Sequence, residues 1–573
     1  MNIFNEFEEK LYAVYAKLSK QHDFPSNLDL SKCVIELPRD ETHGDLACNA
    51  ALVLAKPLNY PPRKLAELIA KELEKDDSVL ATEIAGPGFI NLRLHQSRWG
   101  QEILTILEQA DAFGKNTIGT GKNINIEFVS ANPTGPLHAA HARGAILGDV
   151  LSNLMAFSGY NVTREYYIND AGSQIITLSK SAYLRYCEVL GVKIDSIPSG
   201  LYPGDYLIDV GEKLASKFGD SLHQLSEAEQ VEVIGPIAVE LMMSSIKKDL
   251  SRLGITMDVY SSENTLVKNG NVSSAIQKLQ QDGLIYKGKP EAPKGQRDDQ
   301  WAPREQLLFK SKEFGDDVDR PLQKSDDSWT YFASDVAYHF DKLERTNGRL
   351  VDVLGADHSG YVKRMTAAVQ AMSGEKDMLQ IKQCGLVTLL DKGQPVKMSK
   401  RAGTFVTLSD VIDAVGADVM RFMMLTRRND QPLEFDYAKV TEKSRDNPVF
   451  YVQYAHARAK SVLRQNKKPI AEVNYSVLTD IHEIRVIKQL SSWPKLVEAA
   501  VHQCEPHRIA FYLMELAAVF HGLWNAGRDN LELKFIQESD DELTLARMQL
   551  IDATALVIKS GLNLLSIDAV EEM

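Results

Sequence analysis

Cysteine is scarce in this sequence, and no two cysteines lie close together. The five cysteines are spread over the whole chain and form no CxxC spacing; they are Cys33, Cys48, Cys187, Cys384 and Cys504. A disulfide framework or a cysteine-ligated zinc site needs clustered cysteines. The sequence therefore predicts a reducing, cytoplasmic setting and no structural zinc.

Long hydrophobic runs are also missing. No stretch of 18 or more apolar residues occurs, and the first ten residues carry Glu6, Glu8 and Glu9. A membrane-spanning helix needs about 20 predominantly apolar residues, and a signal peptide needs a basic start followed by an apolar segment. We therefore expect no membrane span and no signal peptide.

Basic residues are outnumbered by acidic ones. There are 65 Lys and Arg against 78 Asp and Glu, which gives a formal net charge of −13. This balance disfavours nucleic-acid binding over the whole surface, although a local basic patch remains possible. The chain has 573 residues, of which 44% are hydrophobic and 25% charged, a globular composition. That length suggests about three or four domains.

Hydrophobic patterning divides the chain into three parts. The first part, to about residue 110, combines a helix pattern at 65–73 with a turn and strand at 84–94, which predicts a small α+β domain. Strand, turn, helix and strand follow in order over 124–168, which predicts a βαβ unit and hence a parallel sheet. From 407 the pattern is helical almost to the end.

Two histidines lie at the turn between the first strand and the helix of this βαβ unit. His138 and His141 are three residues apart at the expected helix start, so they share a face. A helix N-terminus offers free N–H groups and positive dipole charge, and two imidazoles there could donate hydrogen bonds to phosphate oxygens. Ordinary first-turn polar residues are the alternative, and a metal pair would lack a third ligand.

A second motif lies far downstream of the histidines. Lys397, Lys400 and Arg401 place three cations within five residues, between Gly393 and Gly403. A cationic loop that closes on a polyphosphate is the functional interpretation. A solvated surface loop is the alternative when the motif is taken by itself.

Taken together and in this order, the two motifs resemble the HIGH and KMSK signatures of class I aminoacyl-tRNA synthetases. The surrounding segments resemble arginyl-tRNA synthetases of the bacterial type. These segments are residues 85–91, 126–138, 166–172, 355–358, 397–403 and 447–458.

The resemblance implies an α/β fold with three domains. A small α+β N-terminal domain at 1–112 would contact tRNA, and a Rossmann-like parallel-sheet catalytic domain at 120–406 would carry an insertion at about 174–330. An all-α helical bundle at 407–573 would bind the anticodon. The implied activity is ATP-dependent ligation of L-arginine to tRNA(Arg) through an arginyl-adenylate, by a monomer, with Mg²⁺ accompanying ATP.

The resemblance also implies roles for individual residues. Catalysis would fall to His138, His141, Lys397 and Lys400, which stabilise charge on the phosphates. The residues expected at ATP are Pro133, Gly135, His138, His141, Gly355, Asp357, His358, Met398 and Ser399. Those expected at arginine are Glu127, Ser130, Asn132, Tyr331 and Asp335. A guanidinium is a donor-only fork that needs carboxylates, so Asp335 and Glu127 are expected to bind it and Asn132 the α-amino group.

One segment of the chain is basic, although the net charge of the whole chain is negative. Residues 447–471 contain no Asp or Glu. Cations interleaved with aromatic rings suit phosphates and unstacked bases, although a solvated basic helix face is the alternative. The residues expected to bind tRNA are Tyr451, Tyr454, Arg458, Lys460 and Arg464.

Two further readings of the whole chain stay open. One is a different class I synthetase on a similar scaffold; the set of Tyr331, Asp335 and Glu127, together with the lack of CxxC, disfavours an enzyme specific for cysteine or methionine. The other is a non-catalytic tRNA-binding paralogue, which would not need the intact His138, His141, Lys397 and Lys400.

Overall fold

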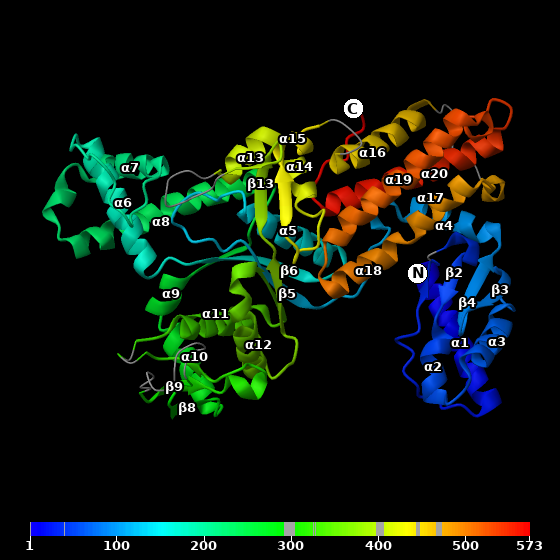
Figure 1. The fold of residues 1–573 in the computed structure, drawn as a ribbon, viewed down its shortest axis with the longest axis horizontal. Helices are drawn as coiled ribbons and strands as arrows, with labels where there is room; N and C mark the ends of the chain where they lie inside the picture. Colours follow the sequence, from blue (N-terminus) through cyan, green and yellow to red (C-terminus); the bar gives the residue numbers. More distant parts are fainter. Residues whose placement is uncertain are drawn as a thin grey trace.

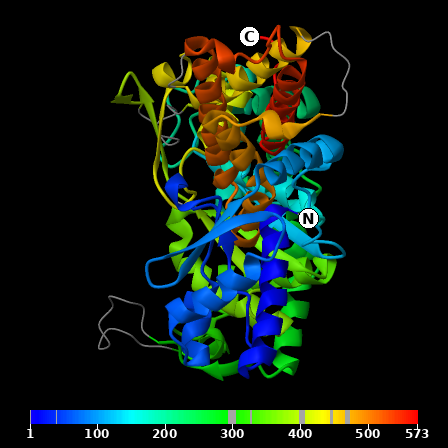
Figure 2. The same ribbon diagram turned by 90° about the vertical axis from the view of Figure 1, so that its right-hand side faces the viewer.

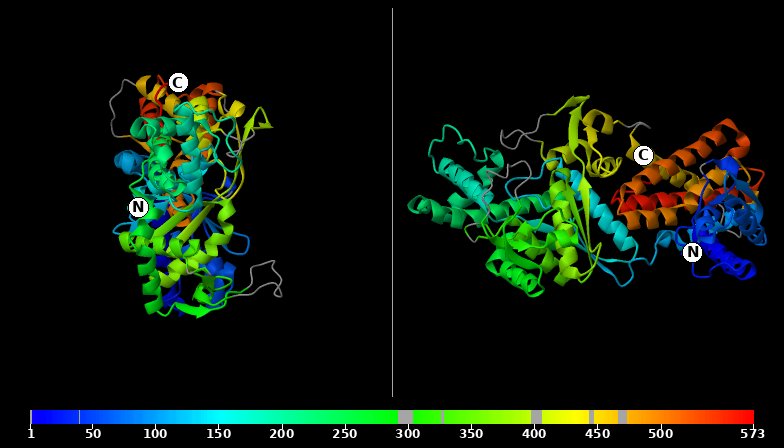
Figure 3. Two further views of the ribbon diagram at one scale, coloured as in Figure 1. Left: turned by 90° about the vertical axis from the view of Figure 1, so that its left-hand side faces the viewer. Right: turned by 60° about the horizontal axis from the view of Figure 1, so that its bottom comes forward.

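Three folded parts follow one another along the chain (Figure 1). The computed structural model describes residues 2–38, 40–291, 304–324, 326, 328–396, 406–442, 447–465 and 473–573. An N-terminal domain and a protruding group of helices, α6 to α8, lie at opposite ends of the molecule (Figures 1 and 3). The catalytic sheet lies between them, and the helical bundle lies at the same end as the N-terminal domain, above it in Figure 1.

The N-terminal domain packs helices on a small antiparallel sheet in the order β1-β2-β4-β3. The expected helix at 65–73 is part of α3, and the expected strand ends in β4 after a turn in which Gly86 has φ +52°. The elements are α1 (Ile3–His22), β1 (Ile35–Glu36), β2 (Leu46–Cys48), α2 (Ala50–Leu58), α3 (Pro62–Leu73), β3 (Val79–Ala85), β4 (Phe89–Leu94) and α4 (Gln96–Gln109).

A five-stranded parallel sheet forms the centre of the molecule, in the order β12-β11-β5-β6-β7. Apolar residues of α5 pack on one face, while α11 and α12 pack on the other, as a buried parallel sheet requires. The elements are β5 (Asn123–Glu127), α5 (His141–Phe157), β6 (Asn161–Ile168), β7 (Val259–Ser262), α11 (Tyr331–Thr346), β11 (Arg349–Gly355), α12 (Ser359–Ser373) and β12 (Leu379–Cys384).

The strand order changes direction at β5. The chain leaves β5 through α5 to β6 on one side, whereas β11 pairs with the other side of β5. In open α/β sheets, ligands bind at this switch point, outside the carboxyl ends of the strands. The fold therefore points to the loops that follow β5 and β11.

Two subdomains interrupt this sheet in sequence. Helices α6, α7 and α8 enclose their own apolar core, and the chain then returns to form the edge strand β7. A small antiparallel sheet in the order β10-β9-β8 follows. The elements are α6 (Ser173–Val189), α7 (Ile208–Phe218), α8 (Glu227–Arg252), α9 (Glu263–Lys268), α10 (Asn271–Gln281), β8 (Ile285–Gly288), β9 (Gln306–Phe309) and β10 (Arg320–Pro321).

The expectation of helix after residue 407 is wrong at one place. Residues Leu433–Asp436 form β15, which runs parallel to β13 (Val387–Asp391), with β14 (Gln394–Pro395) on the other edge. A strand of four residues gains its order from a partner that is distant in sequence. The remaining elements are α13 (Leu408–Val415), α14 (Ala417–Met423), α15 (Tyr437–Val440), α16 (Pro448–Gln465), α17 (Ile481–Ser491), α18 (Trp493–Gln503), α19 (His507–Asp529) and α20 (Asp541–Leu564).

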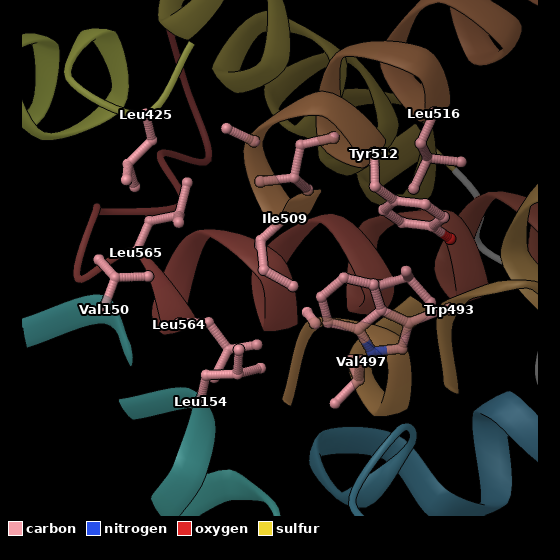
Figure 4. Packing of buried hydrophobic residues seen from close by; sticks show 14 of the residues in the cluster. Val150, Leu154, Leu425, Trp493, Val497, Ile509, Tyr512, Leu516, Leu564 and Leu565 are labelled. Carbon is pink, nitrogen blue, oxygen red and sulfur yellow. The ribbon is translucent and has the colours of Figure 1, made fainter. Parts of the chain in front are cut away.

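The helical bundle is packed against the first helix of the catalytic domain. Leu564 and Leu565 at the end of α20 meet Val150 and Leu154 of α5 (Figure 4). The buried Arg421 donates to Asp149 on α5 and to backbone carbonyls after α8 and α20. The helix that begins at the histidine motif is thus rigidly joined to the bundle.

The N-terminal domain lies against the other side of the bundle (Figure 2). Lys488 pairs with Asp45 at 2.6 Å, and Lys495 pairs with Glu8 at 3.2 Å. Among the residues that the structure describes, α19 is the one helix long and apolar enough to cross a membrane by length and composition, with a mean hydropathy of 1.2. Its buried face lies inside the bundle core, where a long apolar helix is expected in a globular fold (Figure 4).

Candidate functional site

A strained turn begins the loop after β5. Val129 and Ser130 adopt left-handed backbone conformations, with φ +71° and +38°. Such conformations are uncommon for residues other than glycine and persist only where neighbours hold them. Ser130 Oγ donates to Glu127 Oε1 at 2.9 Å and accepts the Tyr167 N–H at 3.0 Å. These bonds direct the following loop across the carboxyl end of the sheet.

The structure brings the two signature histidines together. The His138 and His141 rings are stacked, with 3.7 Å between their centroids. The His138 N–H donates to His141 Nδ1 at 3.2 Å, and His141 is the first residue of α5. Both imidazoles therefore lie at a helix N-terminus, where a phosphate group is favoured.

The segment that follows the second motif in the sequence lies beside this pair. Lys397, Met398, Ser399 and Lys400 lie outside the described residues. The residues after the motif are described, and Thr407 forms a β-bridge with His138. The Leu408 N–H donates to the Leu137 carbonyl at 2.8 Å. The described residues that follow the second motif thus lie directly beside the first motif.

The loop after β11 forms the opposite side of the switch point. Asp357 and His358 have exposed side chains, and His358 Nε2 lies 3.8 Å from Asp357 Oδ2. Gly355 ends β11. On the β5 side, Pro133 and Gly135 are buried, and a Cβ on Gly135 would lie 3.0 Å from Tyr206 of the insertion. Those residues expected at ATP that the structure describes therefore come from both loops of the switch point.

Asp335 is a half-buried carboxylate on α11, on the pocket side of the sheet. Burial, together with the negative charges of Glu263 and Glu127, raises its pKa to about 7. In the described part of the chain no side-chain hydrogen bond to this carboxylate is found. Tyr331 is 71% exposed at the first position of α11, one helical turn before Asp335.

Glu127 is fully engaged inside the protein. Its Oε2 accepts from Lys342 Nζ at 2.6 Å and from the Tyr338 hydroxyl at 2.9 Å, while Oε1 accepts from Ser130. Only 6% of the residue is exposed. Because both oxygens are occupied, Glu127 supports the loop from below, and this geometry disfavours the expected direct contact with a guanidinium.

A charged network that sequence reasoning missed lies beneath the pocket. Lys342 is 0% exposed and lies between Glu127 and Asp352, at 2.6 and 2.7 Å. These two carboxylates are register partners on adjacent strands. Burial opposes ionisation of Asp352, but Lys342 and His339 hold its pKa well below the usual value. The polar stripe along α11 was a usable signal, since its residues lie three or four apart.

We expect Lys342→Met to destabilise the protein strongly. Removing one partner of a buried charge group leaves two facing carboxylates without their shared cation, which costs about 3–5 kcal/mol of unfolding free energy. Urea unfolding would measure it. The control is Lys363→Met, which breaks an exposed pair with Asp317, and exposed pairs are worth about 0–1 kcal/mol. Equal losses in the two variants would contradict the expectation.

The basic stretch of α16 is partly tied into the bundle. The Arg458 guanidinium lies over the rings of Tyr454 at 4.1 Å and Trp524 at 4.7 Å. Arg464 donates to the Glu571 carbonyl and pairs with Glu572 at 3.5 Å. Lys460 is half-buried, and no ion pair to it is found within the described ranges. Among the described cations of this stretch, Lys460 is therefore the one with its charge available.

No metal centre is formed by the residues that the structure describes, because no group of three or more His, Cys, Asp or Glu could hold an ion. All five cysteines are buried and unpaired. Burial raises the pKa of Cys48 and Cys384 to about 12, so these thiols stay protonated.

Comparisons with known proteins cover the full chain. Three family models match: the arginyl tRNA synthetase N terminal domain at 5–94, the catalytic domain of tRNA synthetases class I (R) at 102–442, and the DALR anticodon binding domain at 452–573. The chain is 51% identical to an arginine–tRNA ligase of Cereibacter sphaeroides and to one of Parvibaculum lavamentivorans, with 100% of each chain covered. The structure of Thermus thermophilus arginyl-tRNA synthetase has the same fold, with a TM-score of 0.73 at 19% identity over 100% of both chains.

Proposed function

The chain belongs to the arginyl-tRNA synthetase family, and from this premise we propose how its residues perform the reaction. The family, the fold class and the activity predicted from the sequence are confirmed by the full-length match to arginine–tRNA ligases. The enzyme joins L-arginine to tRNA(Arg). The arginine carboxylate attacks the α-phosphate of ATP and pyrophosphate leaves; the arginyl group then passes to the terminal adenosine of tRNA and AMP is released.

We propose that His138 and His141 donate hydrogen bonds to the ATP phosphates. Their stacked rings at the N-terminus of α5 support this role, because charge develops on these oxygens during activation. We propose further that Mg²⁺ arrives with ATP and takes most of its ligands from phosphate and water. The other residues proposed at the nucleotide are Pro133, Gly135, Gly355, Asp357, His358, Lys397, Met398, Ser399 and Lys400.

We propose that Asp335 binds the arginine guanidinium and Asn132 the α-amino group. A half-buried carboxylate with no hydrogen bond to another described residue supports this assignment, since a guanidinium offers donors and positive charge. Glu127 and Ser130 shape the loop that carries Asn132. Tyr331, which is exposed at the start of α11, would bind arginine from the solvent side of the site.

Aminoacylation with each amino acid in turn tests the function. Purified protein, ATP, Mg²⁺ and mixed tRNA should charge with arginine and with no other amino acid. A site that binds a guanidinium with carboxylates discriminates against other amino acids by about 10⁴-fold in kcat/KM, because a substrate without a guanidinium leaves these carboxylates unpaired. Charging with another amino acid, or none, would overturn the assignment.

We propose that tRNA lies along α16 and that Lys460 contacts a phosphate. Lys460→Glu should then raise the KM for tRNA by about 3- to 10-fold and reduce the slope of log affinity against log salt by about one. Filter binding at several salt concentrations measures both. Lys376→Glu changes the net charge equally on an exposed turn of the catalytic domain and is the control. An equal effect of both variants would show that only total charge matters.

We also propose that the enzyme acts as a monomer in the cytoplasm, without a membrane partner and without structural zinc. Five buried, unpaired cysteines support a reducing compartment.

A further inference from the structure

Tyr167 lies on the same face of the catalytic sheet as the charged network beneath α11. Side chains alternate along β6, so Glu165 and Tyr167 share the face toward α11, and Tyr166 faces the opposite side. The Tyr167 ring lies 4.3 Å from the Tyr338 ring, centroid to centroid, and its N–H donates to Ser130. These contacts place Tyr167 at the carboxyl end of β6, beside the proposed arginine site.

The hydroxyl of Tyr167 is buried without a hydrogen bond. It is shielded from solvent, and the described residues provide no partner for it. Buried polar groups are nearly always paired, so an unpaired one in an enzyme pocket requires an explanation. The neighbouring Tyr166 is satisfied, because its hydroxyl donates to the Ala131 carbonyl at 2.7 Å. Of these two adjacent tyrosines, only one has an unused hydroxyl.

Carboxylates surround this hydroxyl. Burial, and then the negative charges of Glu263, Asp335, Glu127 and Asp170, raise the pKa of Tyr167 above its ordinary value. The phenol therefore keeps its proton and offers one donor together with an accepting oxygen. Glu127 is already bonded on both oxygens, and Asp170 accepts from Ser262 and from the Asn264 N–H. Of the remaining carboxylates, Asp335 lies on α11 three residues before Tyr338, on the helix face that Tyr167 packs against, and so is the partner best placed to use that donor.

We propose that Tyr167 is a specificity-determining residue for the amino acid substrate. When arginine binds, the Tyr167 O–H donates to the Asp335 carboxylate, and its oxygen accepts an N–H of the bound guanidinium. A guanidinium has five donors in a fixed plane, so a carboxylate and a phenol oxygen set at an angle can be reached together. The inference rests on the proposed role of Asp335 and adds a second, neutral acceptor that fixes the plane of the guanidinium.

Tyr167→Phe tests the proposal because it removes a single oxygen atom. The KM for arginine in aminoacylation should rise about 10- to 100-fold, as for a lost hydrogen bond to a charged group, with kcat nearly unchanged. Agmatine, which carries the guanidinium but no carboxylate, should lose affinity as a competitive inhibitor by a similar factor. The melting temperature should stay the same or rise, because the deleted hydroxyl had no partner.

Tyr166→Phe is the matched control, and it should lower the melting temperature because its hydroxyl is bonded. An unchanged KM for arginine in Tyr167→Phe, or an unchanged agmatine affinity, would overturn the proposal. If Tyr167→Phe lowered the melting temperature as far as Tyr166→Phe does, the Tyr167 hydroxyl would have a structural role, and the proposal would also be overturned. Failure of the unaltered enzyme to charge tRNA with arginine would instead overturn the proposed function, so the two failures are distinguishable.

Discussion

Replacing Asp335 by asparagine is expected to lower kcat/KM for arginine by about 10³-fold or more. The side chain keeps its size but loses the charge that pairs with the guanidinium, and an amide N–H₂ would face donors with a donor. Aminoacylation at varied arginine concentrations measures the loss. Asp341→Asn is the control, because Asp341 lies on the same helix but pairs with Arg345 away from the pocket.

The pH dependence follows from the same carboxylate. With its pKa near 7, Asp335 must release a proton before it binds a cation, so the KM for arginine should rise as pH falls below about 7. The raised pKa also means that ionisation destabilises the fold: the stability of the neutral form is present at low pH and is lost as pH rises through 7. Asp335→Asn should therefore melt higher than the unaltered protein at pH 8 without arginine.

Two results would contradict this account. One is an Asp335→Asn variant within tenfold of the unaltered kcat/KM, which would place the guanidinium elsewhere. The other is an arginine KM that is flat between pH 6 and 8, which would show that Asp335 is ionised throughout this range.

Periodicity predicted the long elements and failed for the short ones. The helix pattern before residue 157 and the strand at 162–168 appear as α5 and β6. The strands β7 and β15 have four residues each and were not predicted. Such strands carry little periodic signal of their own, and their pairing with β6 and β13 decides their conformation.

Some residues of the functional site could likewise be predicted from the sequence, and others could not. The spacing of His138 and His141 was visible in the sequence because both belong to one short turn. The Lys342–Glu127 pair was not, because its partners are 215 positions apart and meet only when α11 crosses β5. Tyr167 was hidden for a different reason: an unsatisfied hydroxyl is a property of three-dimensional burial, and no pattern in the chain encodes it.

The net charge of the chain did not indicate that its partner is a nucleic acid. The total of −13 averages over the chain, whereas residues 447–471 contain no acidic residue. The structure reduces the number of candidate tRNA-binding cations in that stretch, because Arg458 packs on aromatic rings of the bundle and Arg464 pairs with a C-terminal residue. Among the described residues of this stretch, Lys460 is thus identified by its local surroundings and not by the composition of the chain.

His141→Ala is expected to slow arginine activation by about 10²- to 10³-fold, the usual effect of losing one preorganised donor to a developing negative charge. The KM for arginine should change little, because the imidazole would act on phosphate oxygens. ATP–pyrophosphate exchange in the presence of tRNA isolates this step, and His141→Asn, which keeps a donor, should recover part of the rate. His482→Ala is a matched control, since His482 is also a first-turn histidine, on α17 in the bundle. If both alanine variants lost the same small amount, His141 would be an ordinary polar residue of a helix start, and the stacked pair would have no part in the chemistry.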